Sequence, residues 1–159
     1  MAQHVMPRYR GFNLLDLFST SNRWDEHFPM THGDFVEDDL RWIQEWGFDF
    51  VRIPMSYLYL IADRERWNFL EWRMEQLDRL ICLGERYNIH ISLSFHRAAG
   101  YCITGYPFDI AESGSLWTEQ EDLELFCRHW EILAKRYKGI DSGKLSFDLV
   151  NEPPLLVDT

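Results

Sequence analysis

The sequence predicts an α/β fold in which four parallel strands alternate with helices, which is half of a (β/α)8 TIM barrel. Short stretches with apolar residues at every second position, the period of a strand, are separated by stretches with the three-to-four-residue period of a helix. Connections that contain a helix make successive strands parallel, and they are nearly always right-handed. Polar residues end three of the strands, as they do in (β/α)8 barrels: Arg52, His96 and Glu152.

The chain is short for a whole barrel. A (β/α)8 barrel typically needs about 250 residues, whereas this chain has 159. We therefore expect one domain, residues 1–159, truncated to strands one to four of a barrel. A half-barrel has two open sheet edges, and because open edges and apolar patches favour association, we also expect a homo-oligomer.

The first half of the chain is predicted to contain two strands and two helices. Residues 10–14 form the first strand, and residues 48–54 form the second. Between them, Asp34 begins a helix that Gly47 ends. A longer helix over residues 67–87 carries an apolar stripe that we assign to the core: Trp67, Leu70, Met74, Leu77 and Ile81.

The third strand spans residues 89–96 and has two different faces. Ile89, Ile91, Leu93 and Phe95 share the apolar face, and Ser92, Ser94 and His96 share the polar face. A helix over residues 119–137 follows, and Gly139 ends it. Its apolar stripe is predicted to be Leu123, Phe126, Trp130, Leu133 and Tyr137.

The last strand is predicted over residues 145–153. Its leucines lie on one face, and its carboxylates, Asp148 and Glu152, lie on the other. Pro153 ends the strand because proline has no N–H for the ladder. Carboxylates on a strand make sense if their face points into a barrel, and Glu152 would then lie at the barrel mouth.

The amino-acid composition and the net charge exclude some classes of binding partner. The chain is 46% hydrophobic and 16% aromatic, which is ample for a core. It has 16 basic against 26 acidic residues, a net charge of −10. This charge argues against nucleic acid and an anionic membrane surface as partners. Residues 1–10 lack the apolar core of a signal peptide, and a secreted or a cytoplasmic parent protein both remain open.

The three cysteines are Cys82, Cys102 and Cys127, and they show no Cys-x-x-Cys spacing. An odd number without that spacing argues against a zinc site or a disulfide framework. Cys82 and Cys127 fall within apolar helical patterns, so we expect them to be reduced core residues.

Four strand-end motifs, in this order, resemble glycoside hydrolase family 5, the cellulase family. They are Arg10-Gly11-Phe12-Asn13, Val51-Arg52-Ile53-Pro54, Ser94-Phe95-His96-Arg97 and Phe147-Asp148-Leu149-Val150-Asn151-Glu152-Pro153. The resemblance covers essentially the whole chain but only the N-terminal half of the family's barrel. It implies a retaining β-glucan hydrolase.

The resemblance also implies roles for individual residues. Glu152 matches the general acid/base, and Asn151 matches the residue that hydrogen-bonds the sugar 2-hydroxyl. Arg52 matches the arginine that supports the nucleophile, and His96 matches a substrate-contacting histidine. The loop over residues 97–117 carries several aromatic residues, and two of them, Tyr101 and Trp117, either stack on sugar or pack within the loop.

One part of the family's machinery has no counterpart in these four strands. The family's nucleophilic glutamate belongs on the seventh strand, and Asp148 is expected to be an internal partner of Arg52 or a polar residue of the sheet instead. Two functions follow. The chain is a retaining endo-β-1,4-glucanase, or part of one, or it is a non-catalytic half-barrel that binds β-glucan or oligosaccharide. Neither function implies a metal or an organic cofactor.

Overall fold

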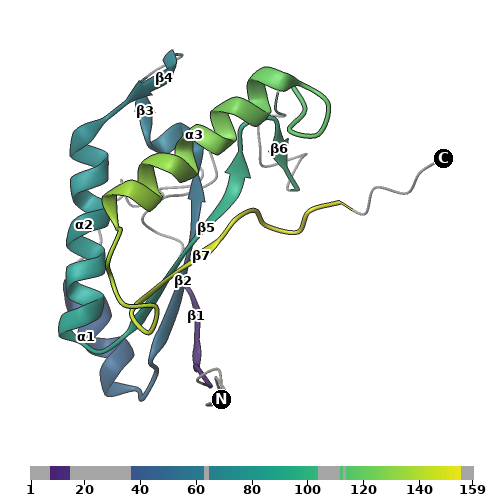
Figure 1. Cartoon of the computed structure of the whole chain (residues 1–159). Coiled ribbons are helices and arrows are strands. Elements are labelled where there is room, and N and C mark those ends of the chain that lie inside the picture. Colours follow the sequence, from purple (N-terminus) through teal and green to yellow (C-terminus); the bar gives the residue numbers. More distant parts are fainter. Residues whose placement is uncertain (1–7, 15–36, 63–64, 104–111, 113, 155–159) are drawn as a thin grey trace, which may run out of the picture.

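The computed structural model describes residues 8–14, 37–62, 65–103, 112 and 114–154. Within them, parallel strands pair in the order β1 (Gly11–Asn13), β2 (Phe50–Ser56), β5 (His90–Ala98) and β7 (Leu145–Asp148). Helices α1 (Glu37–Glu45), α2 (Glu71–Arg86) and α3 (Gln120–Arg136) lie between these strands in sequence and beside the sheet in space (Figure 1). The described residues therefore form a partial TIM barrel, and the predicted fold class is confirmed.

The core lies between the sheet and the helices. The two central strands, β2 and β5, bury the alternate residues that face the helices, as the predicted strand period requires. These are Val51, Ile53, Met55, Ile91, Leu93 and Phe95. The helices contribute Leu40 from α1, Leu77 and Leu80 from α2, and Leu125 and Leu133 from α3. The opposite face of the sheet carries the polar residues described below.

The long second helix is shorter than predicted, because a hairpin occupies its expected start. After a 3-10 turn, η1 (Tyr57–Tyr59), strands β3 (Ile61–Ala62) and β4 (Glu65–Phe69) pair antiparallel. Trp67 lies in β4 and is half-exposed, and Leu70 caps α2 without belonging to it. Assigning these two residues to the helix was wrong, whereas Met74, Leu77 and Ile81 are buried as predicted.

The stripe predicted for α3 is largely confirmed. Leu133 and Tyr137 are buried, and Phe126 and Trp130 are partly buried against the core, whereas Leu123 is exposed. The helix also buries Asp122, Leu125 and His129, and the two polar residues among them fall outside the apolar pattern. The buried carboxylate and imidazole have specific partners that no local pattern reveals.

The last strand ends at Asp148 and not at Pro153. Its final pairing joins Asp148 to Ser94 of β5. Beyond this point the backbone N–H of Asn151 donates to the carbonyl oxygen of Phe95 at 2.8 Å, which is a loop contact and not a ladder position. Figure 1 shows this segment leaving the sheet below β6 (Tyr101–Cys102), which pairs antiparallel with the end of β5.

Other predictions have mixed outcomes. Gly47 follows α1 with φ +79°, as expected of a helix-ending glycine, while Asp34 lies outside the described residues. All three cysteines are free, but Cys82 and Cys127 are exposed, so placing them in the core was wrong. Both sit on the outer sides of their helices, which face away from the sheet.

Of the helices described, none has the length and apolar character that crossing a membrane requires.

Candidate functional site

A polar cluster centred on Arg52 joins the middle of β2 and β5 to the carboxyl end of β7. The guanidinium donates to Asp148 Oδ2 from Nε at 2.9 Å, and Nη2 lies 2.8 Å from the same oxygen in an ion pair. Nη2 also donates to Ser94 Oγ at 2.7 Å and to Asn151 Oδ1 at 2.8 Å. The Ser94 hydroxyl in turn donates to Asp148 Oδ2 at 2.8 Å. The expectation that Asp148 is the internal partner of Arg52 is confirmed.

Asn151 is fixed in position and in orientation. Its side chain is buried, and its backbone N–H is bonded to Phe95. A guanidinium can only donate hydrogen bonds, so the Asn151 atom that faces Arg52 must be the carbonyl oxygen. The amide nitrogen therefore points the other way, towards Glu152 Oε1 at 3.4 Å. In this way Arg52 determines which group Asn151 presents to Glu152.

Glu152 is an exposed carboxyl on an unusual backbone. Its φ of +46° lies in the left-handed region, which costs a residue with a Cβ roughly 1 kcal/mol or more. The Tyr101 hydroxyl, on β6, donates to the Glu152 backbone carbonyl oxygen. Burial and the nearby Glu152 charge raise the pKa of Tyr101, which keeps its hydroxyl protonated as a donor. The indole of Trp117 meets the Tyr101 ring edge-on, with centroids 5.7 Å apart.

His96 stands at the same end of the sheet, where the pairing of β2 and β5 is irregular. Met55 pairs with Phe95, but Ser56 pairs with Arg97, so His96 is the extra residue of a bulge. Bulges of this kind change the direction of side chains beside functional sites. Direct contacts thus link five predicted residues, from Arg52 through Asn151, Glu152 and Tyr101 to Trp117, and the half-buried His96 adjoins them on β5.

Two buried ion pairs near this cluster were not predicted from the sequence. Arg97 is fully buried and pairs with Glu112, whose other oxygen accepts from the Tyr57 hydroxyl at 3.0 Å. Arg66 of β4 pairs with the buried Asp122 at the start of α3. The first pair connects β5 to η1 through Glu112, and the second connects β4 to α3. A charged residue inside an apolar helix pattern, such as Asp122, is the signal that could have indicated them.

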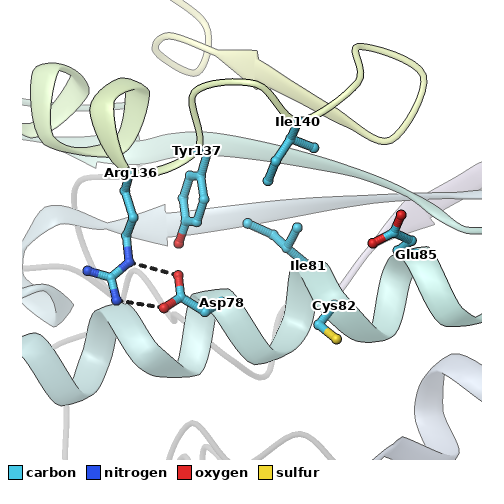
Figure 2. Close-up of a pocket in the computed structure, with 7 residues that line it drawn as sticks. All are labelled: Asp78, Ile81, Cys82, Glu85, Arg136, Tyr137 and Ile140. Atoms are coloured by element: carbon cyan, nitrogen blue, oxygen red, sulfur yellow. Dashed lines mark hydrogen bonds and ion pairs between the residues drawn. The ribbon is translucent and has the colours of Figure 1, made fainter.

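A concave region lies on the helical layer and contains none of the predicted site residues. It is an open groove of about 450 Å³ between α2 and the end of α3. Figure 2 shows the pair at one end of it, in which Arg136 donates to both carboxylate oxygens of Asp78 at 2.8 and 2.6 Å. Its remaining lining residues are Ile81, Cys82, Glu85, Tyr137 and Ile140. The groove lacks the strand-end position that barrel sites share.

Metal chemistry finds no support in the residues that the structure describes, because none of their His, Cys, Asp and Glu side chains gather in groups of three or more with ligand geometry. The arrangement is instead that of a TIM-barrel protein whose strand ends present an arginine, an amide and one carboxyl. The chain belongs to the cellulase family, glycosyl hydrolase family 5, whose model matches residues 10–157.

Characterised relatives agree with this assignment. The chain is 32% identical to cellodextrinase A of Ruminococcus flavefaciens over 116 residues, which are 73% of this chain and 32% of that protein. It is 30% identical to endoglucanase C of Acetivibrio thermocellus over 127 residues, which are 80% of this chain and 34% of that protein. The chain therefore spans about a third of the length of these relatives.

Solved structures give the same fold. A crystal structure of a glycoside hydrolase superposes with a TM-score of 0.77 and 36% identity, covering 94% of this chain and 42% of that one. A tri-modular endo-β-1,4-glucanase from Bacillus licheniformis, solved with cellotetraose, superposes with a TM-score of 0.66 over 91% of this chain and 26% of that one. Its identity of 20% supports the shared fold alone.

Proposed function

We propose that residues 1–159 are a catalytic half-barrel of a retaining endo-β-1,4-glucanase, in which Glu152 is the general acid/base. The observation that carries the proposal is the chain of contacts from Arg52 through Asn151 to Glu152, which lies just beyond the carboxyl end of β7. Barrel enzymes place their chemistry at this end. Relatives named as an endoglucanase and a cellodextrinase support a β-glucan or oligosaccharide as the substrate.

In this mechanism Glu152 first donates its proton to the glycosidic oxygen that leaves. It then takes a proton from the water that attacks the glycosyl-enzyme intermediate. The Asn151 amide, oriented by Arg52, contacts the sugar 2-hydroxyl. His96 contacts the substrate on the β5 side, and Tyr101 and Trp117 form the rim beyond Glu152.

The nucleophile is the second carboxyl that the mechanism requires. In retaining glycosidases the two carboxyls lie about 5–5.5 Å apart. Asp148 is bound twice by Arg52 and once by Ser94, so it does not serve as a free nucleophile. The nucleophile must therefore come from outside the four strands, either from further barrel strands or from another copy.

The test compares hydrolysis by the 159-residue chain and by its Glu152→Gln variant, using cello-oligosaccharides and a chromogenic β-glucoside. We expect the substitution to lower the rate by at least 100-fold, in line with the contribution of a general acid. Glu85→Gln, which alters an exposed carboxyl on the helical layer, is the matched control and should leave the rate unchanged. Equal rates for the parent chain and the Glu152 variant would eliminate the enzymatic role.

A second candidate function is sugar binding without hydrolysis. It is favoured by the single free carboxyl in the contact chain described above, since one carboxyl cannot complete double displacement. Calorimetric titration with cellotetraose distinguishes the two candidates. Binding without release of reducing ends supports this second function, whereas release that depends on Glu152 supports the first.

We also propose that the chain associates with itself through its sheet edges. Strands β1 and β7 lie at the two ends of the described parallel sheet, and each carries a large exposed apolar residue, Phe12 and Phe147 respectively. Leu149, just after β7, is 58% exposed. Open sheet edges that carry exposed apolar side chains favour association between chains.

A further inference from the structure

Trp72 is an exposed tryptophan whose ring is supported from behind. It lies in the first turn of α2 and is 49% exposed. The guanidinium carbon of Arg73 lies 3.8 Å from the centroid of the Trp72 ring and 3.8 Å from the centroid of the Tyr59 ring. The guanidinium is therefore stacked between the two rings. It covers one face of Trp72 and leaves the other face towards solvent.

Hydrogen bonds anchor the two groups that support Trp72. The Tyr59 hydroxyl donates to Gln76 Oε1, and Arg73 Nη1 donates to the same oxygen at 3.4 Å. Gln76 lies one turn after Trp72 in α2, so η1 and the start of the helix are fixed together. A planar guanidinium between two rings is well ordered, and a tryptophan has only two side-chain torsions. A ligand that stacks on Trp72 therefore orders little of the protein.

Trp72 lies at the end of the sheet that the candidate site shares. Strand β2 leads through η1 and the β3–β4 hairpin into α2, so the helix begins where the strand ends. Figure 1 shows α2 starting beside this hairpin, at the end of the sheet towards which β2 and β5 run. Barrel enzymes bind their substrates at this end. A polymer bound at the strand ends can reach the rim on which Trp72 stands.

We propose that the exposed face of Trp72 is a stacking platform for a neutral β-glucan chain, outside the site at the strand ends. The choice of ligand rests on the proposed function, in which a β-glucan is the substrate. The apolar C–H face of a sugar ring matches the flat apolar face of an indole. The net charge of −10 favours a neutral polymer over a polyanion.

The test is native gel electrophoresis of the whole chain in gels with and without hydroxyethylcellulose, a neutral soluble β-glucan derivative. We expect the polymer to slow the parent chain and Trp72→Ala to weaken this binding by about fivefold. The matched control is Trp46→Ala, which removes a 64% exposed tryptophan directly after α1, just before β2 begins. This control should be slowed as much as the parent. Mobility in the gel without polymer shows that each variant is folded.

Two further variants show whether the stacked face itself makes the contact. Trp72→Tyr keeps an aromatic face and should weaken binding by only about twofold. Arg73→Lys keeps the charge but loses the planar group behind Trp72, and it should also weaken binding by about twofold. A role of Trp72 that was merely structural would not rank alanine, tyrosine and the lysine at position 73 in this order.

Each result decides for or against the platform. A parent chain that the polymer does not slow, or equal slowing of the parent and Trp72→Ala, would overturn the inference. It would also be overturned if Trp72→Ala changed only the association of the chain with itself, because the face would then bind a second copy. Binding that depends on Trp72, in a chain whose hydrolysis does not depend on Glu152, would uphold the platform and reject the proposed hydrolase function. Hydrolysis that depends on Glu152 without any effect of Trp72 would do the reverse.

Discussion

His129 is a histidine that folding removes from water. Its ring is 1% exposed on the inner side of α3, and the rings of Tyr57, Phe69 and Phe95 surround it edge-on at 5.5, 4.9 and 5.6 Å. One ring nitrogen lies 2.7 Å from the Leu125 carbonyl oxygen, one turn earlier. Burial lowers the pKa of His129 to about 4, and the neutral ring is the form that the core accommodates.

This burial makes stability depend on pH. The unfolded chain binds a proton at His129 below pH 6.5, whereas the folded chain does so only near pH 4. Stability is therefore lost as the pH falls from about 6.5 to 4, by roughly 3 kcal/mol in total. We expect His129→Phe to flatten this part of the curve in urea unfolding experiments. A smaller slope should remain from His90, whose pKa burial also lowers, and an unchanged slope would contradict the assignment to His129.

At the scale of elements, the turn between β5 and β6 is closely packed against the start of α3 and the residues before it. Gly100 has φ +70°, and a Cβ added there would lie 2.5 Å from Asp122 Oδ2 and 2.5 Å from the backbone nitrogen of Leu116. Asp122 cannot move aside easily, because it is buried and paired with Arg66. The turn thus depends both on the conformational freedom of glycine and on its lack of a side chain.

Gly100→Ala should therefore cost more than the backbone strain alone. Gly47 is the matched control, since its φ is +79° but a Cβ there would meet nothing within 4 Å. We expect Gly47→Ala to lower the free energy of unfolding by about 1 kcal/mol, and Gly100→Ala to lower it by about 3 kcal/mol. Chemical denaturation of the two variants measures the difference. Similar losses would show that the packing around Asp122 relaxes freely.

The elements also show what local sequence can and cannot predict. The strands β2 and β5 follow from alternation, because a buried parallel strand needs apolar residues on the face under the helices. The β3–β4 hairpin was missed because Trp67 and Leu70 stand three residues apart, which satisfies the helical period equally well. The apolar stripe of α3 was predicted correctly except for Leu123, but the buried Asp122 and His129 were missed, because partners distant in sequence surround them and periodicity contains no information on such partners.

For the candidate site the limit is similar. Arg52 was predicted near the end of its strand and Glu152 at the end of the last one, whereas β2 continues to Ser56 and β7 ends at Asp148, four residues before Glu152. The bulge at His96, the left-handed backbone of Glu152 and the Tyr101 contact could not be predicted, since each depends on how β6 and the segment after β7 meet in space. Tyr101 was expected to face sugar or pack in its loop, and the structure shows it bound to the Glu152 backbone.

At the scale of the whole molecule, the described sheet leaves apolar surface at its β7 edge. Phe147 is covered on one side by Trp130 of α3, with ring centroids 5.4 Å apart, and is still 40% exposed. Leu149, two residues later, is 58% exposed. A net charge of −10 opposes association at long range, so the apolar edge must outweigh a general repulsion.

Self-association through this edge should respond to a single charge. We expect the parent chain to scatter light as a dimer or larger species and Leu149→Lys to shift it towards the monomer, because a buried lysine at the contact is costly. Trp46→Lys is the control, as it replaces a 64% exposed apolar residue directly after α1. Added salt should strengthen the parent's association by screening its net charge. A parent chain that is monomeric at all concentrations, or equal effects of the two lysines, would exclude the β7 edge as the contact.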